Sequence, residues 1–243
     1  MIFWIASYPK SGNTWIRSFI STYYLSNSEN FEFNLLKQIR QFPHEKFFTN
    51  RLENINEAIS NWENAQKQII KNKKIVFLKT HAALMAINNK HFTSEKYSIG
   101  GIYIVRDPRN VITSLANHYN LDFKDSFKFM TNKNKYLIND NIKKINYGNF
   151  QFISSWKDHY KSWKYYKKFR ILYIKYEDLE NNPLDMFLKI ISFINEIQNI
   201  KTKIDNSRVK KILNSINFDN LKKKESIEGF EESVYSKTTG KKI

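Results

Sequence analysis

Short apolar runs alternate along the chain with longer segments in which apolar residues recur at helical spacing. Four runs rich in isoleucine, valine and aromatic residues predict buried strands, at residues 2–6, 75–78, 102–105 and 171–174. Because helical patterns separate these runs, their order predicts parallel strands joined by crossover helices. We therefore expect an α/β fold, a three-layer open parallel sheet flanked by helices. Ligands of such sheets bind beyond the carboxyl ends of the strands.

Helix starts are marked by capping residues, by prolines or by the onset of helical spacing, at Asn13, Asp107, Asn182 and Ser207. Asp107 is expected to be an N-cap, followed by Pro108 as the first helical residue. The polar stretch 26–74 is expected to be mostly helical. Residues 120–165 are expected to form helices and loops.

Composition limits the class of protein. With 243 residues, 41% of them hydrophobic and 16% aromatic, the chain can form one large core, and we expect a single domain over residues 1–243. Cysteine is absent, which excludes disulfides, thiolate metal sites and cysteine nucleophiles. No run approaches the ~18–20 apolar residues of a membrane-spanning helix. The N-terminus predicts a core strand and not a signal peptide, so we expect a cytoplasmic protein without a membrane span.

The charge balance points to an anionic partner. Lysine and arginine total 40 against 23 aspartate and glutamate, a net charge of +17. Nucleic acid, a membrane surface, or a phosphorylated or sulfated small molecule would each fit this charge. Much of the excess is lysine, however, which AT-rich codon usage also produces, so the few arginines are more informative. Nucleic acid is not favoured, because no basic stripe carries interleaved aromatic residues.

The loop after the first predicted strand has the features of an anion site. In the sequence YPKSGNTW a glycine turn opens a helix, which offers backbone N–H groups and the positive end of the helix dipole. Lys10 adds a positive charge, and Ser11 and Thr14 add hydroxyl donors. The pattern is not that of P-loop NTPases, because no Gly-Lys-Ser/Thr follows the glycine turn. An ordinary strand-to-helix turn with a solvated lysine is the alternative.

Arg106 stands at the end of the third predicted strand, with Ser114 further along the helix that follows. A guanidinium is suited to bidentate binding of phosphate. The alternative is that Arg106 pairs with Asp107 or another acid.

His81 stands at the end of the second predicted strand, just after Lys79 and Thr80. An imidazole there can take a proton from a hydroxyl near neutral pH, although a structural or surface histidine is the alternative. The remaining histidines have no comparable setting: His44, His91, His118 and His159. A phosphate loop, an arginine and a base at three strand ends together predict transfer of a group from a phosphorylated nucleotide to a hydroxyl.

The motifs YPKSGNTW, KTH, IYIVRDPRNVITS and YEDLENNP resemble, in order and spacing, those of the PAPS-dependent sulfotransferases of the cytosolic type. The resemblance runs from residue 2 to about residue 230 and is closest to bacterial members. It implies the P-loop-like sulfotransferase fold. It also implies transfer of a sulfuryl group from PAPS, the co-substrate, to a hydroxyl or an amine, without a metal.

The resemblance also implies roles around the phosphates. Lys10 would contact the bridging oxygen and the 5′-phosphate and stabilise charge on the leaving nucleotide. Arg106 and Ser114 would bind the 3′-phosphate. The residues that would cradle the 5′-phosphate are Ser11, Gly12, Asn13 and Thr14.

Other roles implied by the resemblance concern the adenine and the acceptor. Trp15 would stack on the adenine, Tyr176 would contact the adenine region, and Phe218 would be a second aromatic residue facing the base. His81 would be the general base on the acceptor hydroxyl, with Lys79 nearby.

The last residues depart from the family pattern. Members carry a basic loop near the C-terminus, roughly Arg-Lys-Gly, which closes over the 3′-phosphate. Residues 218–237 resemble the lead-in to this loop, but residues 238–243 contain no Arg-Lys-Gly. We therefore expect a domain truncated at its C-terminus, mobile over residues 230–243 without ligand, and a weak or inactive enzyme.

Two other functions compete with this prediction. A small-molecule kinase would need a metal-binding acid near the anion loop, and Glu177 with Asp178 is the tempting pair, although a structural turn accounts for it better. A non-catalytic binder of anionic nucleotides would use the basic surface alone. The acceptor, whether a small molecule, a glycan or a lipid, depends on residues 30–75 and 120–165, where motifs are absent. Nothing in the pattern indicates the oligomeric state.

Overall fold

The computed structural model describes residues 1–72, 74–138 and 146–228. Contacts between Cα atoms divide the chain into two compact units. The first unit comprises Met1–Tyr8, Arg40–Val105 and Phe129–Tyr173. The second comprises Pro9–Ile39, Arg106–Lys128 and the chain from Ile174 onward. The prediction about residues 230–243 lies outside the described residues.

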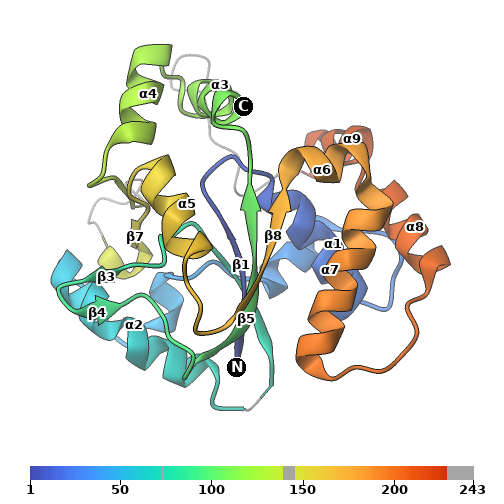
Figure 1. Cartoon of the computed structure of the whole chain (residues 1–243), viewed down its shortest axis with the longest axis horizontal. Coiled ribbons are helices and arrows are strands. Elements are labelled where there is room, and N and C mark those ends of the chain that lie inside the picture. The colour runs from blue at the N-terminus through green and yellow to red at the C-terminus, as the bar shows by residue number, and fades with distance from the viewer. Residues whose placement is uncertain (73, 139–145, 229–243) are drawn as a thin grey trace. The chain divides into compact units, whose positions relative to one another are not determined.

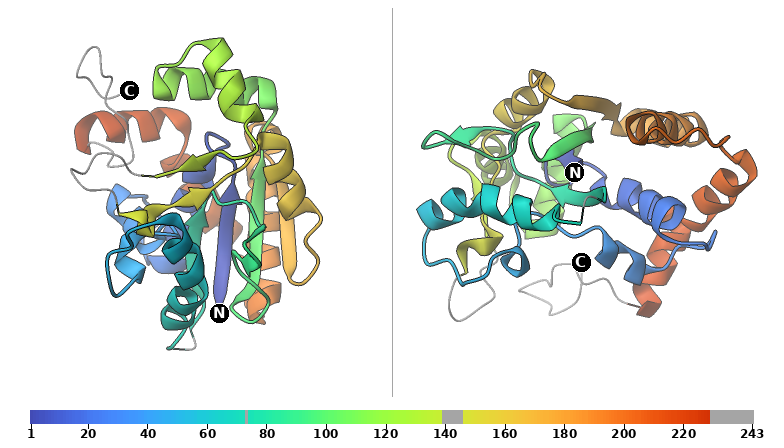
Figure 2. Two further views of the ribbon diagram at one scale, coloured as in Figure 1. Left: turned by 90° about the vertical axis from the view of Figure 1, so that its left-hand side faces the viewer. Right: turned by 90° about the horizontal axis from the view of Figure 1, so that it is seen from below.

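The predicted strands form one sheet in the order β2-β1-β5-β8 (Figure 1). β1 pairs in parallel with both β2 and β5, and Figure 2 (left) shows these three strands side by side. All six residues of β1 are buried, as its unbroken apolar pattern predicts. The strand bounds are β1 (Ile2–Ser7), β2 (Val76–Thr80), β5 (Ser98–Val105) and β8 (Arg170–Lys175).

β5 begins at Ser98, before the predicted apolar run at residues 102–105, because Gly100 and Gly101 are also part of the strand. A Cβ on Gly101 would lie 3.0 Å from both the Cβ and the carbonyl oxygen of Trp4 on the neighbouring strand. Glycine therefore allows the backbone to approach the largest side chain of β1 closely. The Trp4 indole donates a hydrogen bond of 2.7 Å to Ser98 Oγ at the start of the same strand.

Around the sheet, the first unit contains helices and short two-stranded sheets. Their bounds are η2 (Glu45–Phe47), α2 (Ile55–Ile69), β3 (Ala86–Ile87), β4 (Lys90–His91), β6 (Tyr136–Leu137), η3 (Tyr147–Asn149), β7 (Gln151–Phe152) and α5 (Trp156–Lys164). The prediction that residues 26–74 are mostly helical is only partly correct: α2 is helical, but residues 39–54 form irregular chain around one 3₁₀ turn. This stretch is anchored by scattered apolar side chains without helical spacing, among them Phe42 and Leu52.

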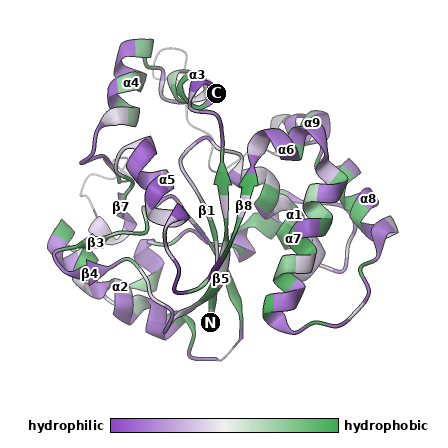
Figure 3. Cartoon of the chain, viewed as in Figure 1, coloured by the Kyte–Doolittle hydropathy of each residue, from purple (hydrophilic) through white to green (hydrophobic). Residues whose placement is uncertain are grey.

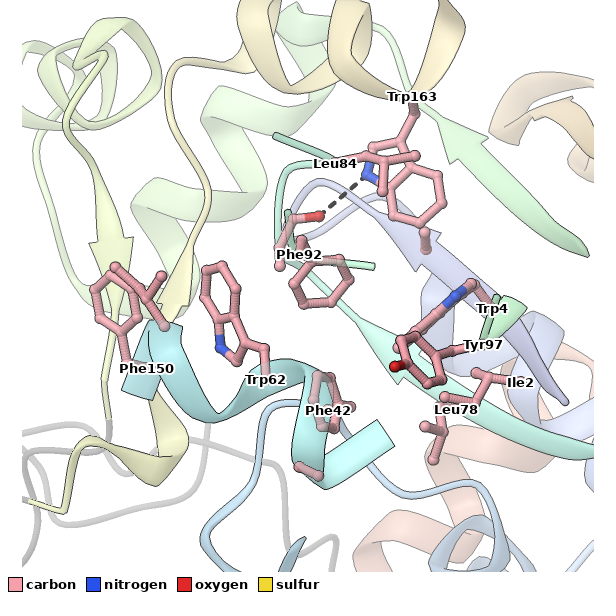
Figure 4. Packing of buried hydrophobic residues seen from close by; sticks show 14 of the residues in the cluster. Ile2, Trp4, Phe42, Trp62, Leu78, Leu84, Phe92, Tyr97, Phe150 and Trp163 are labelled. Carbon is pink, nitrogen blue, oxygen red and sulfur yellow. Dashed lines mark hydrogen bonds between the residues drawn. The ribbon is translucent and has the colours of Figure 1, made fainter. Parts of the chain in front are cut away.

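The core of the first unit lies between the sheet, α2 and α5. Trp4, Phe42 and Phe92 pack together with ring centroids 5.3–5.8 Å apart, and Trp62 of α2 contacts Phe92 and Phe150 (Figure 4). In Figure 3, β5 and β8 are largely hydrophobic, whereas α2 and α5 carry many hydrophilic positions. That contrast is expected of strands inside a core and helices with one face in solvent.

The second unit is helical. Its element bounds are α1 (Asn13–Leu25), η1 (Phe33–Gln38), α3 (Pro108–Tyr119), α6 (Tyr176–Asn181), α7 (Pro183–Gln198), α8 (Asn206–Ser215) and α9 (Phe218–Glu228), and α4 (Phe123–Thr131) begins here and ends in the first unit. α1 packs on α7, with the Phe19 and Phe187 rings 4.3 Å apart. The predicted cap is confirmed: Asp107 accepts a hydrogen bond from the Arg109 backbone N–H, and Pro108 is the first residue of α3.

Candidate functional site

The loop between β1 and α1 has a backbone that few sequences can adopt. Gly12 is the N-cap of α1 and has φ +90°, and Lys10 has φ +64°, both in the left-handed region. A Cβ on Gly12 would also lie 2.3 Å from the Tyr176 ring. Glycine is therefore required for two reasons: the backbone is left-handed at this position, and the Tyr176 ring occupies the space that a Cβ would need. No side chain caps the start of α1, so its first N–H groups are of the kind that bind anions.

Arg106 and Tyr176 hold this loop from the other side within the second unit. The Arg106 guanidinium donates a hydrogen bond of 3.1 Å to the Lys10 carbonyl oxygen and lies over the Tyr176 ring, 4.3 Å from its centroid. The Trp15 ring meets Tyr176 edge-on at 6.3 Å and Phe187 at 5.8 Å. The structure therefore brings together four residues that the sequence predicted for one site. We call the group of Lys10, Ser11, Trp15, Arg106 and Tyr176 the anion cradle.

The acidic side chains of Asp107 and Glu177 make their hydrogen bonds with groups other than Arg106. The Asp107 carboxylate bonds to Arg109, with 2.5 Å between Arg109 Nη2 and Asp107 Oδ2, and not to Arg106. This contact lowers the pKa of Asp107 to about 2. Glu177 accepts a hydrogen bond of 2.9 Å from the Asp107 backbone N–H, which fits the structural turn expected for it. The guanidinium of Arg106 is thus directed to the cradle and not to the acid that follows it.

Three buried polar atoms of the anion cradle lack a hydrogen-bond partner within the described part of the chain. They are Ser11 Oγ, Trp15 Nε1 and Arg106 Nε. Unpaired buried polar atoms are rare in folded proteins and call for an explanation. A hydroxyl, an indole N–H and a guanidinium N–H can all donate, and an anion offers acceptors only. The cradle therefore has the donor set that a phosphate group needs.

The other residues predicted for the cofactor lie in the second unit with different exposure. Asn13 is buried. Thr14, in the first turn of α1, and Ser114, within α3, are half-buried. Phe218 is the first residue of α9, and 77% of its side chain is exposed. No contact described for Phe218 joins it to Trp15 or Tyr176. The structure thus gathers most of the predicted set around α1, and no described contact joins Ser114 or Phe218 to it.

In the first unit, His81 follows β2 and is oriented by the end of β1. Its Nδ1 lies 2.8 Å from the Ser7 carbonyl oxygen and 3.3 Å from Ser7 Oγ. A carbonyl oxygen can only accept, so this contact places the proton on Nδ1 and leaves the lone pair on Nε2. That tautomer is the one a general base needs. Lys79, two residues earlier, is buried in β2, and its backbone binds Arg40 and Phe42.

His159 of α5 was passed over in the sequence, yet it contacts the backbone of His81. The His159 side chain is fully buried, with Nε2 3.0 Å from the His81 carbonyl oxygen and Nδ1 2.9 Å from the Tyr103 hydroxyl. The Tyr8 ring packs edge-on against it at 5.3 Å. Burial lowers the pKa of His159 to about 3. The available signal was a histidine among aromatic residues, in a stretch expected to form helices and loops, and this more often marks a core residue than a site.

This buried histidine predicts a pH dependence of stability. Because the pKa of His159 falls from 6.5 to about 3 on folding, the unfolded chain binds the proton first. The neutral ring's contribution is therefore complete above pH 6.5 and is lost as the pH falls from 6.5 toward 3. Urea unfolding of His159→Gln should show a shallower decline across that window than wild type, by up to about 1.4 kcal/mol per pH unit. Equal slopes for the two proteins would contradict a neutral His159.

Within residues 1–72, 74–138 and 146–228, no group of three or more histidine or acidic side chains is placed to hold a metal ion. Over the same ranges, no helix is both long enough and apolar enough to cross a membrane.

Comparison with known proteins agrees with this geometry. A luciferin sulfotransferase from Photinus pyralis is 23% identical over 235 residues, covering 92% of this chain and 57% of the relative. Sulfotransferase 1B1 from Canis lupus familiaris is 25% identical over 221 residues, covering 90% of this chain and 65% of the relative. This chain thus spans less than two thirds of the length of either relative.

Among solved structures, that of mouse sulfotransferase SULT7A1 complexed with PAP is similar with a TM-score of 0.55 and 20% identity, covering 91% of this chain and 65% of the mouse chain. This similarity and the parallel pairing of β1 with its neighbours confirm the predicted α/β sulfotransferase fold. A family model described as a sulfotransferase domain matches residues 2–241. With nearly its whole length matched, the chain belongs to the sulfotransferase domain family.

Proposed function

We propose that this protein transfers a sulfuryl group from PAPS to a hydroxyl or amine acceptor. The observation that carries the proposal is the anion cradle, in which Ser11, Trp15 and Arg106 present buried donors without partners among the described residues. Membership of the sulfotransferase family supports the reaction class. The PAP bound to the similar mouse enzyme supports the choice of donor.

The residues of the cradle fit the donor nucleotide. Lys10 and residues 11–14 would hold its 5′-phosphate at the start of α1, and Arg106 with Ser114 would hold its 3′-phosphate. The adenine would contact the aromatic rings of Trp15, Tyr176 and Phe218. When bound, PAPS supplies the sulfuryl group, whose bond to the 5′-phosphate oxygen breaks as the acceptor oxygen or nitrogen bonds to sulfur.

The chain's own residues would move a proton and stabilise charge. His81, with its lone pair on Nε2, would take the proton of the acceptor. The Lys10 ammonium would offset the charge that develops on the phosphate side. Ser7, which orients the His81 ring, and Lys10 belong to one continuous segment, β1 and the loop that follows it. Catalysis of this kind depends mainly on positioning and charge stabilisation.

Nucleotide selectivity tests the proposal. If Arg106 reads a 3′-phosphate, calorimetry should show PAP binding at least about tenfold tighter than AMP, a gap of about 1.4 kcal/mol. Arg106→Ala should erase that gap, because it removes the charged donor at the cradle. Arg109→Ala is the matched control, since Arg109 is exposed and pairs with Asp107 outside the cradle, and it should keep the gap. Equal affinity of the wild-type chain for PAP and AMP would contradict the proposal.

Several finer points stay predictions. We propose a small molecule, a glycan or a lipid as the acceptor. A cytoplasmic location and a single domain over residues 1–243 are likewise proposed. An assay without magnesium would separate the sulfotransferase from the competing kinase, which needs a metal to bind its nucleotide.

A further inference from the structure

The backbone that follows β2 is held mainly by side chains. At His81, the N–H donates to Gln151 Oε1 at 3.0 Å, and the carbonyl oxygen lies 3.0 Å from His159 Nε2. The Ala82 N–H donates to Thr80 Oγ1, and the Ala82 carbonyl oxygen accepts from the Trp163 indole, each at 3.0 Å. Figure 4 shows this last hydrogen bond as a dashed line from Trp163.

The segment remains anchored over the next two residues. The Ala83 N–H donates to the Phe152 carbonyl oxygen of β7 at 2.8 Å. The Leu84 N–H donates to Ser162 Oγ at 2.9 Å. The four residues from His81 to Leu84 are thus fixed mainly by side chains of α5 and by β7, and not by a regular ladder.

Three of these anchors come from one face of α5: His159, Ser162 and Trp163. Their spacing of three and four residues places them side by side on a helix. The helix itself is fixed at its start, where Ser155 Oγ accepts a hydrogen bond from the Asp158 backbone N–H. His159 and Trp163 are fully buried. We call these three side chains the α5 clamp.

The hydrogen bonds of His159 define its proton positions. The His81 carbonyl oxygen can only accept, so His159 Nε2 carries the proton and donates. His159 Nδ1 then accepts from the Tyr103 hydroxyl. The result is a directed chain of two hydrogen bonds, from Tyr103 through His159 to the backbone of His81. A protonated His159 would have a second N–H facing the Tyr103 hydroxyl, and burial opposes that charge.

The hydrogen bonds around His81 therefore constrain it at three points. Gln151 binds its N–H, His159 binds its carbonyl oxygen, and Ser7 binds its ring. We propose that His159 is a positioning residue for His81: by holding the His81 carbonyl, it sets the backbone from which the ring reaches Ser7 and so maintains the Nδ1–H tautomer. The consequence for catalysis rests on the proposed role of His81 as the base, whereas the positioning itself does not.

Two substitutions separate hydrogen bonding from packing. His159→Phe keeps a ring of similar size but removes both hydrogen bonds. His159→Gln can restore them, because its amide can donate to the His81 carbonyl and accept from Tyr103. Trp62→Phe is the control for a disturbed core, since Trp62 packs on Phe92 and Phe150, and no hydrogen bond described for it reaches residues 81–84.

The first measurement needs no activity. ¹⁵N NMR of the histidine rings, with His81 assigned through His81→Asn, should show the Nδ1–H tautomer of His81 in wild type, His159→Gln and Trp62→Phe. In His159→Phe that signature should give way to a mixture of tautomers. An unchanged His81 signature in folded His159→Phe overturns the proposal. If that variant does not fold, His159→Leu takes its place, because leucine also lacks both hydrogen-bonding nitrogens; an unchanged His81 signature there overturns the proposal equally.

The second measurement is a double-mutant cycle on kcat. His159→Phe should lower kcat about ten- to hundredfold, the range expected when a catalytic group is misplaced by about 1 Å. The same change should have almost no effect in a His81→Ala background, because both substitutions then act on one group. An equal loss in both backgrounds means that His159 acts elsewhere and overturns the proposal. If His81→Ala alone leaves kcat unchanged, the proposed base is wrong, and the NMR result still decides whether His159 positions His81.

Discussion

His81→Ala is expected to lower turnover of PAPS by about 10²-fold or more while leaving the affinity for PAP nearly unchanged. General-base catalysis contributes about 10²–10⁴ in rate, and the alanine removes the lone pair that would take the acceptor proton. The loss should fall on kcat and not on nucleotide binding, because the described contacts of His81 are with Ser7, Gln151 and His159. Initial rates with an acceptor that the wild-type chain sulfates, together with calorimetry of PAP, measure both quantities.

Lys10→Ala is the matched comparison for this result. The proposed lysine stabilises the leaving phosphate, so its removal should lower kcat and weaken PAP binding together. A His81→Ala protein that retains full activity would remove the histidine from the mechanism. A Lys10→Ala protein with unchanged PAP affinity would place the ammonium away from the phosphate.

Gly12→Ala is expected to disrupt the anion cradle. The left-handed backbone at φ +90° costs an alanine about 1–2 kcal/mol. The added Cβ would also lie 2.3 Å from the Tyr176 ring, which must then move away from the Arg106 guanidinium. PAP affinity should fall at least about tenfold, equivalent to about 1.4 kcal/mol. Calorimetry with PAP and the urea midpoint of the same protein report the two effects.

Two further variants separate the effect of the strained backbone at residue 12 from the effect of the collision with the Tyr176 ring. Gly12→Ala combined with Tyr176→Ala relieves the collision but keeps the strained φ, so the double variant should be less unstable than the sum of the single changes. Gly148→Ala is the control, because a Cβ there would lie 2.8 Å from the Glu45 Cα, and its nearest neighbours, Glu45, Asn146 and Phe48, include no cradle residue. It should lower stability while leaving PAP affinity intact. Unchanged PAP affinity in Gly12→Ala would show that the loop does not bind the nucleotide.

The strand positions were predictable because buried strands appear in the sequence as short runs of apolar residues. The first apolar run became β1, extended by one residue to Ser7, and the cap at Asp107 formed as expected. The stretch before α2 was not predictable in the same way, because its apolar side chains fill gaps in the core without a regular period. Phe42, for example, is fully buried by contacts with Trp4 and Phe92, which are distant in sequence.

Part of the candidate site was likewise predictable from the sequence, and part was not. Lys10, Arg106 and Tyr176 were found from motifs near strand ends: Arg106 and Tyr176 directly follow β5 and β8, and Lys10 lies in the loop after β1. That the Arg106 guanidinium would hold the Lys10 carbonyl and cover Tyr176, and not pair with Asp107, could not be read from the order of residues. Three acids and two arginines in neighbouring segments allow many pairings, and only the fold selects among them.

By itself, the sequence determined the four strands of the main sheet and the starts of α1, α3 and α7, because periodicity and capping are properties of short segments. The tertiary structure alone decided which polar atoms are buried without partners, such as Ser11 Oγ and Arg106 Nε, and that His159 reaches the backbone of His81. Those facts depend on contacts between residues far apart along the chain. The free energy of such contacts is set by burial in the folded core, where an unpaired donor costs far more than it does in water.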